Sequence, residues 1–325
     1  MSAAGPRARR LTPWGLAAAA VGLVPLTLAA DPALAALLQL GGAPLRGGRF
    51  EGAVSLPLER ASGGHTPVLS FQASGQPLRL LLDTGATMTL LLPAAAARLG
   101  LGLDHQRDTS VTLAGGGLAC GNLRPKRVGL PPLRLAGPSA ADGLLRLEGA
   151  EALVLPVAAL PPGVDGVLGI PSLRQLPFAI DPWAGRVRFG LGALPAAQPP
   201  VAAVGAAAIS LPLRWKRGLP LLDLQGPRGP IPALADTGAE GLFLAPELRR
   251  DLTPVGTGQR LTLVGVCGDQ PVTRLPVLGL GLPGMEIGAA EVILTPNPIF
   301  GQLGVLAVFG QELLSRHRQL WRLDL

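Results

Sequence analysis

The sequence predicts an all-β protein made of two similar lobes with a few short helices. Gly and Pro are abundant, at 45 and 34 of 325 residues, and they follow no three-residue period, which excludes a helical bundle and a collagen-like chain. Apolar residues make up 48% of the chain, enough for one large core or two domains. Residues 67–99 align without gaps on residues 220–252, with 12 of 33 positions identical, which indicates a tandem duplication.

The first element along the chain has the pattern of an export signal. Arginines at positions 7, 9 and 10 precede the apolar residues 14–30, and the stretch ends near Ala33, Leu34 and Ala35. Cleavage after Ala35 is one interpretation, and an uncleaved anchor is the other, because 17 apolar residues reach the lower bound for spanning a bilayer. We therefore expect residues 1–35 to be a signal peptide or N-terminal membrane anchor. The rest would be exported to the periplasm or another extracytoplasmic compartment, or anchored facing that side.

The repeat sets the remaining boundaries. Residues 36–49 are expected to be a spacer, residues 50–192 the first lobe, the uncharged residues 193–208 a linker, and residues 209–325 the second lobe. Each copy contains an apolar run, a Gly turn, a second apolar run and a short helix that starts at Pro93 or Pro246. Residues 110–117 and 260–267 alternate as strands, and residues 165–181 resemble residues 306–324.

Both copies carry the same four residues where a strand meets a turn: Asp83, Thr84, Gly85 and Ala86, and Asp236, Thr237, Gly238 and Ala239. A single Asp-Thr-Gly is an ordinary turn sequence, but two in register are a specific signal. The chain resembles the aspartic protease family, with motifs of the retropepsin-like DTGA type in a two-lobed, pepsin-like single chain. The Val-Leu-Gly and Val-Phe-Gly elements that end at Gly169 and Gly310 extend this resemblance over nearly the whole chain that follows the export signal.

The resemblance implies two tandem retropepsin-like acid-protease barrels related by a pseudo-twofold axis, each supplying one catalytic Asp. Asp83 and Asp236 would share one proton and activate a water for peptide-bond hydrolysis, which makes the chain an aspartic-type endopeptidase. Which Asp acts as the base stays open. Thr84 and Thr237 are expected to hydrogen-bond across to the opposite loop.

The same resemblance implies roles for the small residues of the motifs. Gly85 and Gly238 are expected to permit the turn and the close approach of substrate. Ala86 and Ala239 would keep the site uncrowded, and they stand where pepsins have a hydroxyl that bonds to an Asp, so we expect a raised pKa for the pair. Glu240 follows the second motif and either adds charge near the pair or faces solvent.

Residues 114–121 are Gly-rich, and Gly115, Gly116 and Gly117 are candidates for a flap over the cleft, with a counterpart at residues 264–268. An ordinary hairpin turn is the alternative. Cys120 and Cys267 fall in these two segments, and the sequence leaves open whether they form a disulfide or stay free.

Other classes of function find little support. The net charge is +7, but the arginines are scattered, so we expect no nucleic-acid partner. The three histidines show no metal-ligand spacing, and residues 279–284 match a dinucleotide motif by letter without a following helix, so neither a metal nor a cofactor is expected. The expected partner is a peptide or protein substrate, bound by a monomer. The rival hypothesis is a catalytically inactive, aspartic-protease-like peptide-binding protein of the cell envelope.

Overall fold

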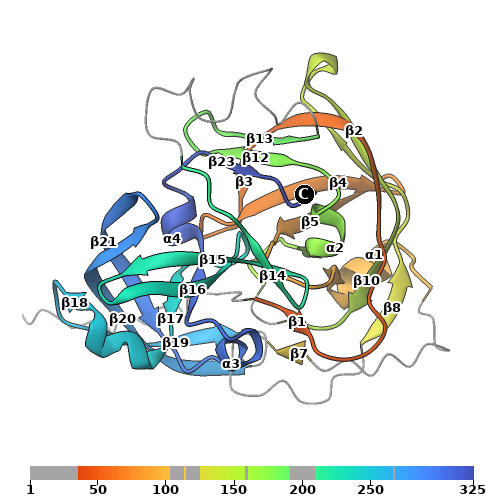
Figure 1. Ribbon diagram of the computed structural model, residues 1–325. Helices are drawn as coiled ribbons and strands as arrows, with labels where there is room; N and C mark the ends of the chain where they lie inside the picture. Colours follow the sequence, from red (N-terminus) through yellow and green to blue (C-terminus); the bar gives the residue numbers. More distant parts are fainter. Residues whose placement is uncertain (1–35, 103–112, 115–124, 158–159, 191–208, 266–267) are drawn as a thin grey trace, which may run out of the picture.

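The computed structural model describes residues 36–102, 113–114, 125–157, 160–190, 209–265 and 268–325. The predicted export signal, the linker, Cys120, Cys267 and Gly115 to Gly117 lie outside the described residues. Over the described part the chain is mainly β with short helices, as predicted, and it forms two large sheets (Figure 1).

The first sheet closes on itself. Pairing runs from β4 through β5, β11, β6, β10 and β9 back to β4, which makes a six-stranded barrel. The strands of this half are β2 (Gly47–Pro57), β3 (Glu59–Arg60), β4 (Pro67–Ala73), β5 (Gln76–Leu82), β6 (Leu90–Leu91), β8 (Lys126–Gly129), β9 (Leu133–Ala136), β10 (Gly143–Val154), β11 (Gly166–Leu168), β12 (Phe178–Asp181) and β13 (Arg186–Phe189). Its helices are α1 (Pro93–Arg98), the 3₁₀ turn η1 (Ala140–Asp142) and α2 (Ile170–Leu173).

The second sheet repeats this arrangement. Its ring runs from β15 through β16, β22, β17, β21 and β20 back to β15. Its strands are β14 (Arg214–Lys216), β15 (Leu219–Gly226), β16 (Gly229–Ala235), β17 (Leu242–Leu244), β18 (Thr253–Pro254), β19 (Gln259–Gly265), β20 (Gly268–Leu282), β21 (Met285–Leu294) and β22 (Ala307–Phe309). Its helices are η3 (Pro246–Asp251), α3 (Ile299–Leu303) and α4 (Gln311–Leu314).

The strand that follows each motif-bearing strand in the ring is parallel to it in both barrels. β5 pairs in parallel with β11, and β16 pairs in parallel with β22. Each of these partners then pairs antiparallel with a short strand, β6 or β17. The same local framework therefore supports both motifs.

The two proline-started helices differ in type. Pro93 begins an α-helix, whereas Pro246 begins a 3₁₀ helix whose last residues lead directly into β18. The first helix contains four alanines, the residue with the highest helix propensity, and the second contains none. Composition therefore agrees with the absence of an α-helix at the second position.

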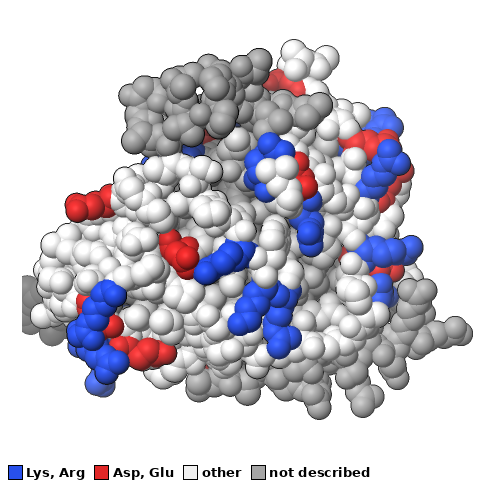
Figure 2. Space-filling view, viewed as in Figure 1, with Lys and Arg blue, Asp and Glu red and all other residues white. Residues whose placement is uncertain are grey.

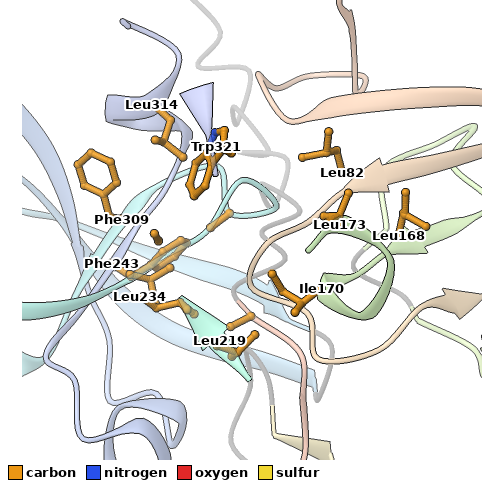
Figure 3. Packing of buried hydrophobic residues seen from close by; sticks show 14 of the residues in the cluster. Leu82, Leu168, Ile170, Leu173, Leu219, Leu234, Phe243, Phe309, Leu314 and Trp321 are labelled. Carbon is orange, nitrogen blue, oxygen red and sulfur yellow. The ribbon is translucent and has the colours of Figure 1, made fainter. Parts of the chain in front are cut away.

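The C-terminal strand joins the two halves. β23 (Gln319–Trp321) pairs antiparallel with β12 of the first sheet, and the Trp321 ring stacks on Phe178 with centroids 5.8 Å apart. Buried apolar residues of both sheets form one continuous cluster, which Figure 3 shows running from Phe243 and Leu234 to Ile170 and Leu173. The two halves thus share a core.

On the face shown in Figure 2, Lys and Arg side chains lie scattered among Asp and Glu and large uncharged areas. None of the helices in the described part of the chain is long and apolar enough to cross a membrane.

Candidate active site

Each motif begins directly after a central strand, and the next element of its barrel holds it. β5 ends at Leu82 and β16 at Ala235, one residue before each Asp. The Asp83 N–H donates to the carbonyl of Leu168 at 3.1 Å, and the Asp236 N–H donates to the carbonyl of Phe309 at 3.0 Å. The two apolar-apolar-Gly elements noted in the sequence therefore fix where each Asp leaves its strand.

The two threonines tie the motifs together by reciprocal hydrogen bonds. The Thr84 N–H donates to Oγ1 of Thr237 at 3.0 Å, and the Thr237 N–H donates to Oγ1 of Thr84 at 2.9 Å. Each hydroxyl donates onward to a carbonyl of the other half, Ala235 at 2.7 Å and Leu82 at 2.8 Å. All of these groups are buried, so breaking any one bond leaves a polar group without water to replace it.

The glycines make room for the opposite carboxyl group, a use that the sequence analysis did not foresee. An added Cβ atom on Gly85 would lie 2.2 Å from Oδ2 of Asp236, and one on Gly238 would lie 2.3 Å from Cγ of Asp83. Neither glycine has a positive φ. Glycine is therefore needed at both positions because a side chain would collide with the opposite carboxyl group. That carboxyl group, and not substrate, occupies the space.

The two carboxyl groups face each other in a fully buried site. Asp83 and Asp236 are 0% exposed, and their Oδ1 atoms accept the N–H groups of Gly85 at 2.7 Å and Gly238 at 2.8 Å. Oδ2 of Asp83 is buried and, among the described residues, receives no hydrogen bond from an N–H or hydroxyl group. The neighbouring Asp236 carboxyl contributes to the raised pKa of Asp83, through its charge and through a side-chain hydrogen bond.

Burial and like charge set the pKa values of the pair. Desolvation, then the charge of Asp236, raises the pKa of Asp83 well above its usual value. Desolvation also raises the pKa of Asp236, to about 6, although hydrogen bonds from the backbone of Gly238, from Asp83 and from the backbone of Ala36 oppose the rise. The site therefore holds a proton at pH values at which ordinary carboxyl groups have lost theirs.

The alanines of the motifs are fully buried and act through their backbones. The amides of Ala86 and Ala239 hydrogen-bond to Asp83 and Asp236 and lower the pKa of each, against the larger effect of burial. Their carbonyls accept the N–H groups of Ile170 at 2.9 Å and Gln311 at 2.7 Å.

Glu240 neither lies alongside the pair as a free charge nor faces solvent. Its carboxylate accepts hydrogen bonds from the N–H of His65 at 2.7 Å, the N–H of Thr66 at 2.8 Å and Oγ1 of Thr66 at 2.5 Å. Glu240 thus joins the second motif to a loop of the first half.

The sequence analysis did not identify Gln311 as part of the site. Its buried side-chain amide donates to the carbonyl of Thr237 at 2.7 Å.

The segment predicted as a spacer begins inside the site. The Ala36 N–H donates to Oδ2 of Asp236 at 3.1 Å, and the Leu37 N–H donates to the carbonyl of Gly85 at 3.0 Å. Strand β1 (Leu38–Gln39) pairs antiparallel with β7 (Leu113–Ala114), the start of the predicted flap, as Figure 1 shows. The sequence analysis did not predict this placement.

The fold and the paired carboxyl groups are those of an aspartic-protease-like protein. In agreement, residues 69–172 match the sequence profile of the family described as Aspartyl protease. The match covers part of the predicted first lobe and includes its DTGA motif, and the retropepsin-like resemblance of that motif agrees with it.

The solved structures that are similar to this chain include three. One is a retropepsin-like aspartic protease from Rickettsia conorii, at 16% identity over 44% of this chain and 93% of that one, with a TM-score of 0.30. Basic 7S globulin from soybean has 9% identity over 86% and 92%, with a TM-score of 0.46. Conglutin gamma from lupine seeds has 10% identity over 84% and 93%, with a TM-score of 0.48. No curated protein matches the chain.

Proposed function

We propose that the chain is an aspartic endopeptidase in which Asp83 and Asp236 together activate a water molecule. The observation that carries this proposal is the buried pair itself: two carboxyl groups, one from each half, positioned by reciprocal threonine bonds and holding a proton with a raised pKa. A structural turn has no need of two buried, facing carboxyl groups, because their desolvation costs stability.

The chemistry follows from the shared proton. In the singly protonated pair, the ionised carboxylate takes a proton from a water held between the two groups, while the protonated carboxyl donates towards the substrate carbonyl oxygen. The water oxygen adds to the carbonyl carbon, and a proton passes to the amide nitrogen as the carbon–nitrogen bond breaks. The threonine network keeps both groups in position, so little rearrangement is needed during the reaction.

The expected substrate is an extended peptide or an unfolded protein, cut by a single chain. The carbonyl of Gly85 and the N–H of Thr87 already bind an extended backbone, that of Leu37. Both carboxyl groups come from one chain, so a monomer suffices. We further propose that the site works outside the cytoplasm, with the N-terminal segment either removed or retained as a membrane tether.

Single substitutions of the pair test this function. Asp83→Asn and Asp236→Asn are each expected to lower kcat/KM for a denatured protein by at least about 100-fold, because each removes the acid–base partner of the other. Asp223→Asn is the matched control, since this residue lies at the surface in an ion pair with Arg214.

If both Asn variants fold and keep full activity, the proposed mechanism is wrong. A wild-type chain that binds peptides and cuts none would support the rival peptide-binding protein instead.

A further inference from the structure

Gln311 makes the surroundings of the two motifs unequal. It is the first residue of α4, and Ile170 is the first residue of α2. Both are buried, and both donate a backbone N–H to the alanine carbonyl of their motif. Gln311 donates to Ala239 at 2.7 Å, and Ile170 donates to Ala86 at 2.9 Å. The two positions are therefore equivalent in the two barrels, but only one carries a side chain that can donate a hydrogen bond.

The Gln311 side chain reaches Asp236 through one peptide group. Its Nε2 atom donates to the carbonyl of Thr237 at 2.7 Å. The N–H of the same peptide group belongs to Gly238 and donates to Oδ1 of Asp236 at 2.8 Å. Hydrogen bonds in a chain polarise one another, so a donor on the carbonyl makes this N–H a stronger donor. Gln311 therefore strengthens a hydrogen bond that favours the ionised form of Asp236.

The first motif has the same peptide group without this donor. The Gly85 N–H donates to Oδ1 of Asp83 at 2.7 Å, as the Gly238 N–H does in the second motif. The residue that corresponds to Gln311 is Ile170, whose side chain has no N–H or O–H group. The relay through the peptide group thus favours a negative charge on Asp236 over one on Asp83.

The remaining contacts of the pair favour the same distribution of charge. Oδ2 of Asp236 accepts the Ala36 N–H at 3.1 Å, whereas Oδ2 of Asp83 receives no N–H or hydroxyl hydrogen bond from the described part of the chain. Desolvation and the charge of Asp236 raise the pKa of Asp83 well above its usual value. Desolvation raises the pKa of Asp236 to about 6, with backbone hydrogen bonds opposing the rise.

The charged groups around Asp236 leave this balance to the pair itself. Asp83 faces Asp236 from the first motif, and Gln311 carries no charge, so the effect of Gln311 does not itself titrate. The other titratable side chains of the surrounding loops and of α4 are bound elsewhere or exposed. They are Glu240, which accepts N–H groups of residues 65–66, Glu312, which pairs with Arg316, and His65, which is exposed.

We propose that Gln311 is a positioning residue that makes Asp236 the carboxylate of the pair, and therefore its base, and that leaves the shared proton on Asp83. The chemistry of this inference rests on the proposed endopeptidase function. Asp236 takes a proton from the water as the water oxygen bonds to the substrate carbonyl carbon, and Asp83 gives its proton to the carbonyl oxygen. Two motifs of identical sequence thus have different roles, because the residues that support them differ.

Carbon-13 NMR of the carboxyl carbons of the full chain tests the location of the proton without any need for activity. Asp83→Asn leaves Asp236 to titrate alone, and Asp236→Asn leaves Asp83, so the two variants also assign the wild-type signals. Between the two titration steps of the wild type, we expect the signal of a carboxylate from Asp236 and that of a protonated carboxyl group from Asp83.

Two substitutions of Gln311 test its part in this asymmetry. Gln311→Met keeps nearly the same length without a donor, and Gln311→Ile introduces the residue of the first barrel. Either change should raise the pKa of Asp236 in the Asp83→Asn chain by about 0.5 and leave the pKa of Asp83 in the Asp236→Asn chain unchanged. Ile170→Val is the matched control and should change neither. A loss of packing alone would not single out one carboxyl group.

The pH dependence of kcat/KM gives a second readout. The pair loses its first proton from Asp236 and its second from Asp83. Gln311→Met should therefore move the acid limb to higher pH by about 0.5 and leave the basic limb in place. A lower kcat/KM with both limbs unmoved is the result of a purely structural role and would overturn the inference.

The outcomes separate this inference from the proposed function. A chain that cuts denatured protein but carries its carboxylate on Asp83, or whose two carboxyl groups respond equally to both Gln311 variants, overturns the role of Gln311 and leaves the endopeptidase intact. A chain that cuts nothing but shows the selective change at Asp236 supports the role of Gln311 in placing the charge and overturns the proposed function.

Discussion

Burying the carboxyl groups of Asp83 and Asp236 side by side costs free energy of folding, which other interactions in the molecule must offset. An isolated buried carboxylate is expensive, and a second one beside it adds like charge, so the pair keeps a proton. The pKa of Asp236 rises from an ordinary value near 3.8 to about 6, a change that corresponds to about 3 kcal/mol.

This cost predicts the dependence of stability on pH. The native pKa values of the pair are raised, so the folded state binds protons more tightly than the unfolded state, and this contribution is fully present below about pH 4 and is lost as pH rises through about 6. Asp83→Asn removes one ionisable group and the like charge, so its free energy of unfolding should fall less between pH 4 and pH 8 than that of the wild type.

Urea unfolding at both pH values measures the difference, with Asp223→Asn as the control expected to follow the wild type. A fall of the same size in Asp83→Asn and the wild type would contradict this prediction, because it would show that the ionisation of Asp83 costs no stability.

The residues after the two motifs show what the sequence could and could not predict at the level of elements. Thr87 and Glu240 align in the repeat, and each binds a segment from outside its own motif, Thr87 residues 37–39 and Glu240 residues 65–66. Aligning the two copies of the repeat showed that this position holds Thr in the first copy and Glu in the second. The contact with the loop at residues 65–66 could not be predicted, because it depends on how the two halves meet.

This contact makes Glu240 a residue for stability. Glu240→Thr should lower the free energy of unfolding by about 1–3 kcal/mol, because the shorter side chain leaves the N–H of Thr66 without its acceptor and the Thr66 hydroxyl with only the longer contact to the carbonyl of Gly238. Urea unfolding measures the effect, and Glu247→Thr is the matched control, since Glu247 is exposed and should change stability by less than about 0.5 kcal/mol. Equal stability of the two variants would contradict the bridging role.

At the scale of the whole molecule, the repeat aligns residues that meet in the structure. The offset of 153 residues between the motifs is also the separation of the two threonines that bond to each other. The similar segments 165–181 and 306–324 each contain two strands, and their last strands, β12 and β23, pair with each other. Sequence similarity identified both segments, but it carries no information on which strand edges meet.

The placement of residues 36–39 was equally hidden from sequence, although they lie against the motif loop. Their mostly apolar sequence fits a spacer, a strand or a pro-segment. Only the contacts with Asp236 and Gly85 distinguish these alternatives. The duplication itself, the lobe boundaries and the export signal stay predictions. The all-β fold with its barrel is confirmed.

The pH dependence of kcat/KM tests most directly the central claim that catalysis uses one proton shared by a buried pair. Both carboxyl groups are protonated below the lower of their two pKa values, so the acid limb should lie near pH 6 and activity should extend to neutral pH. Initial rates on one peptide between pH 3 and pH 9 give the profile, since kcat/KM reports the titrations of the free enzyme. An acid limb near pH 4 or below would contradict the account, because the reacting carboxyl groups would then have the pKa of exposed ones.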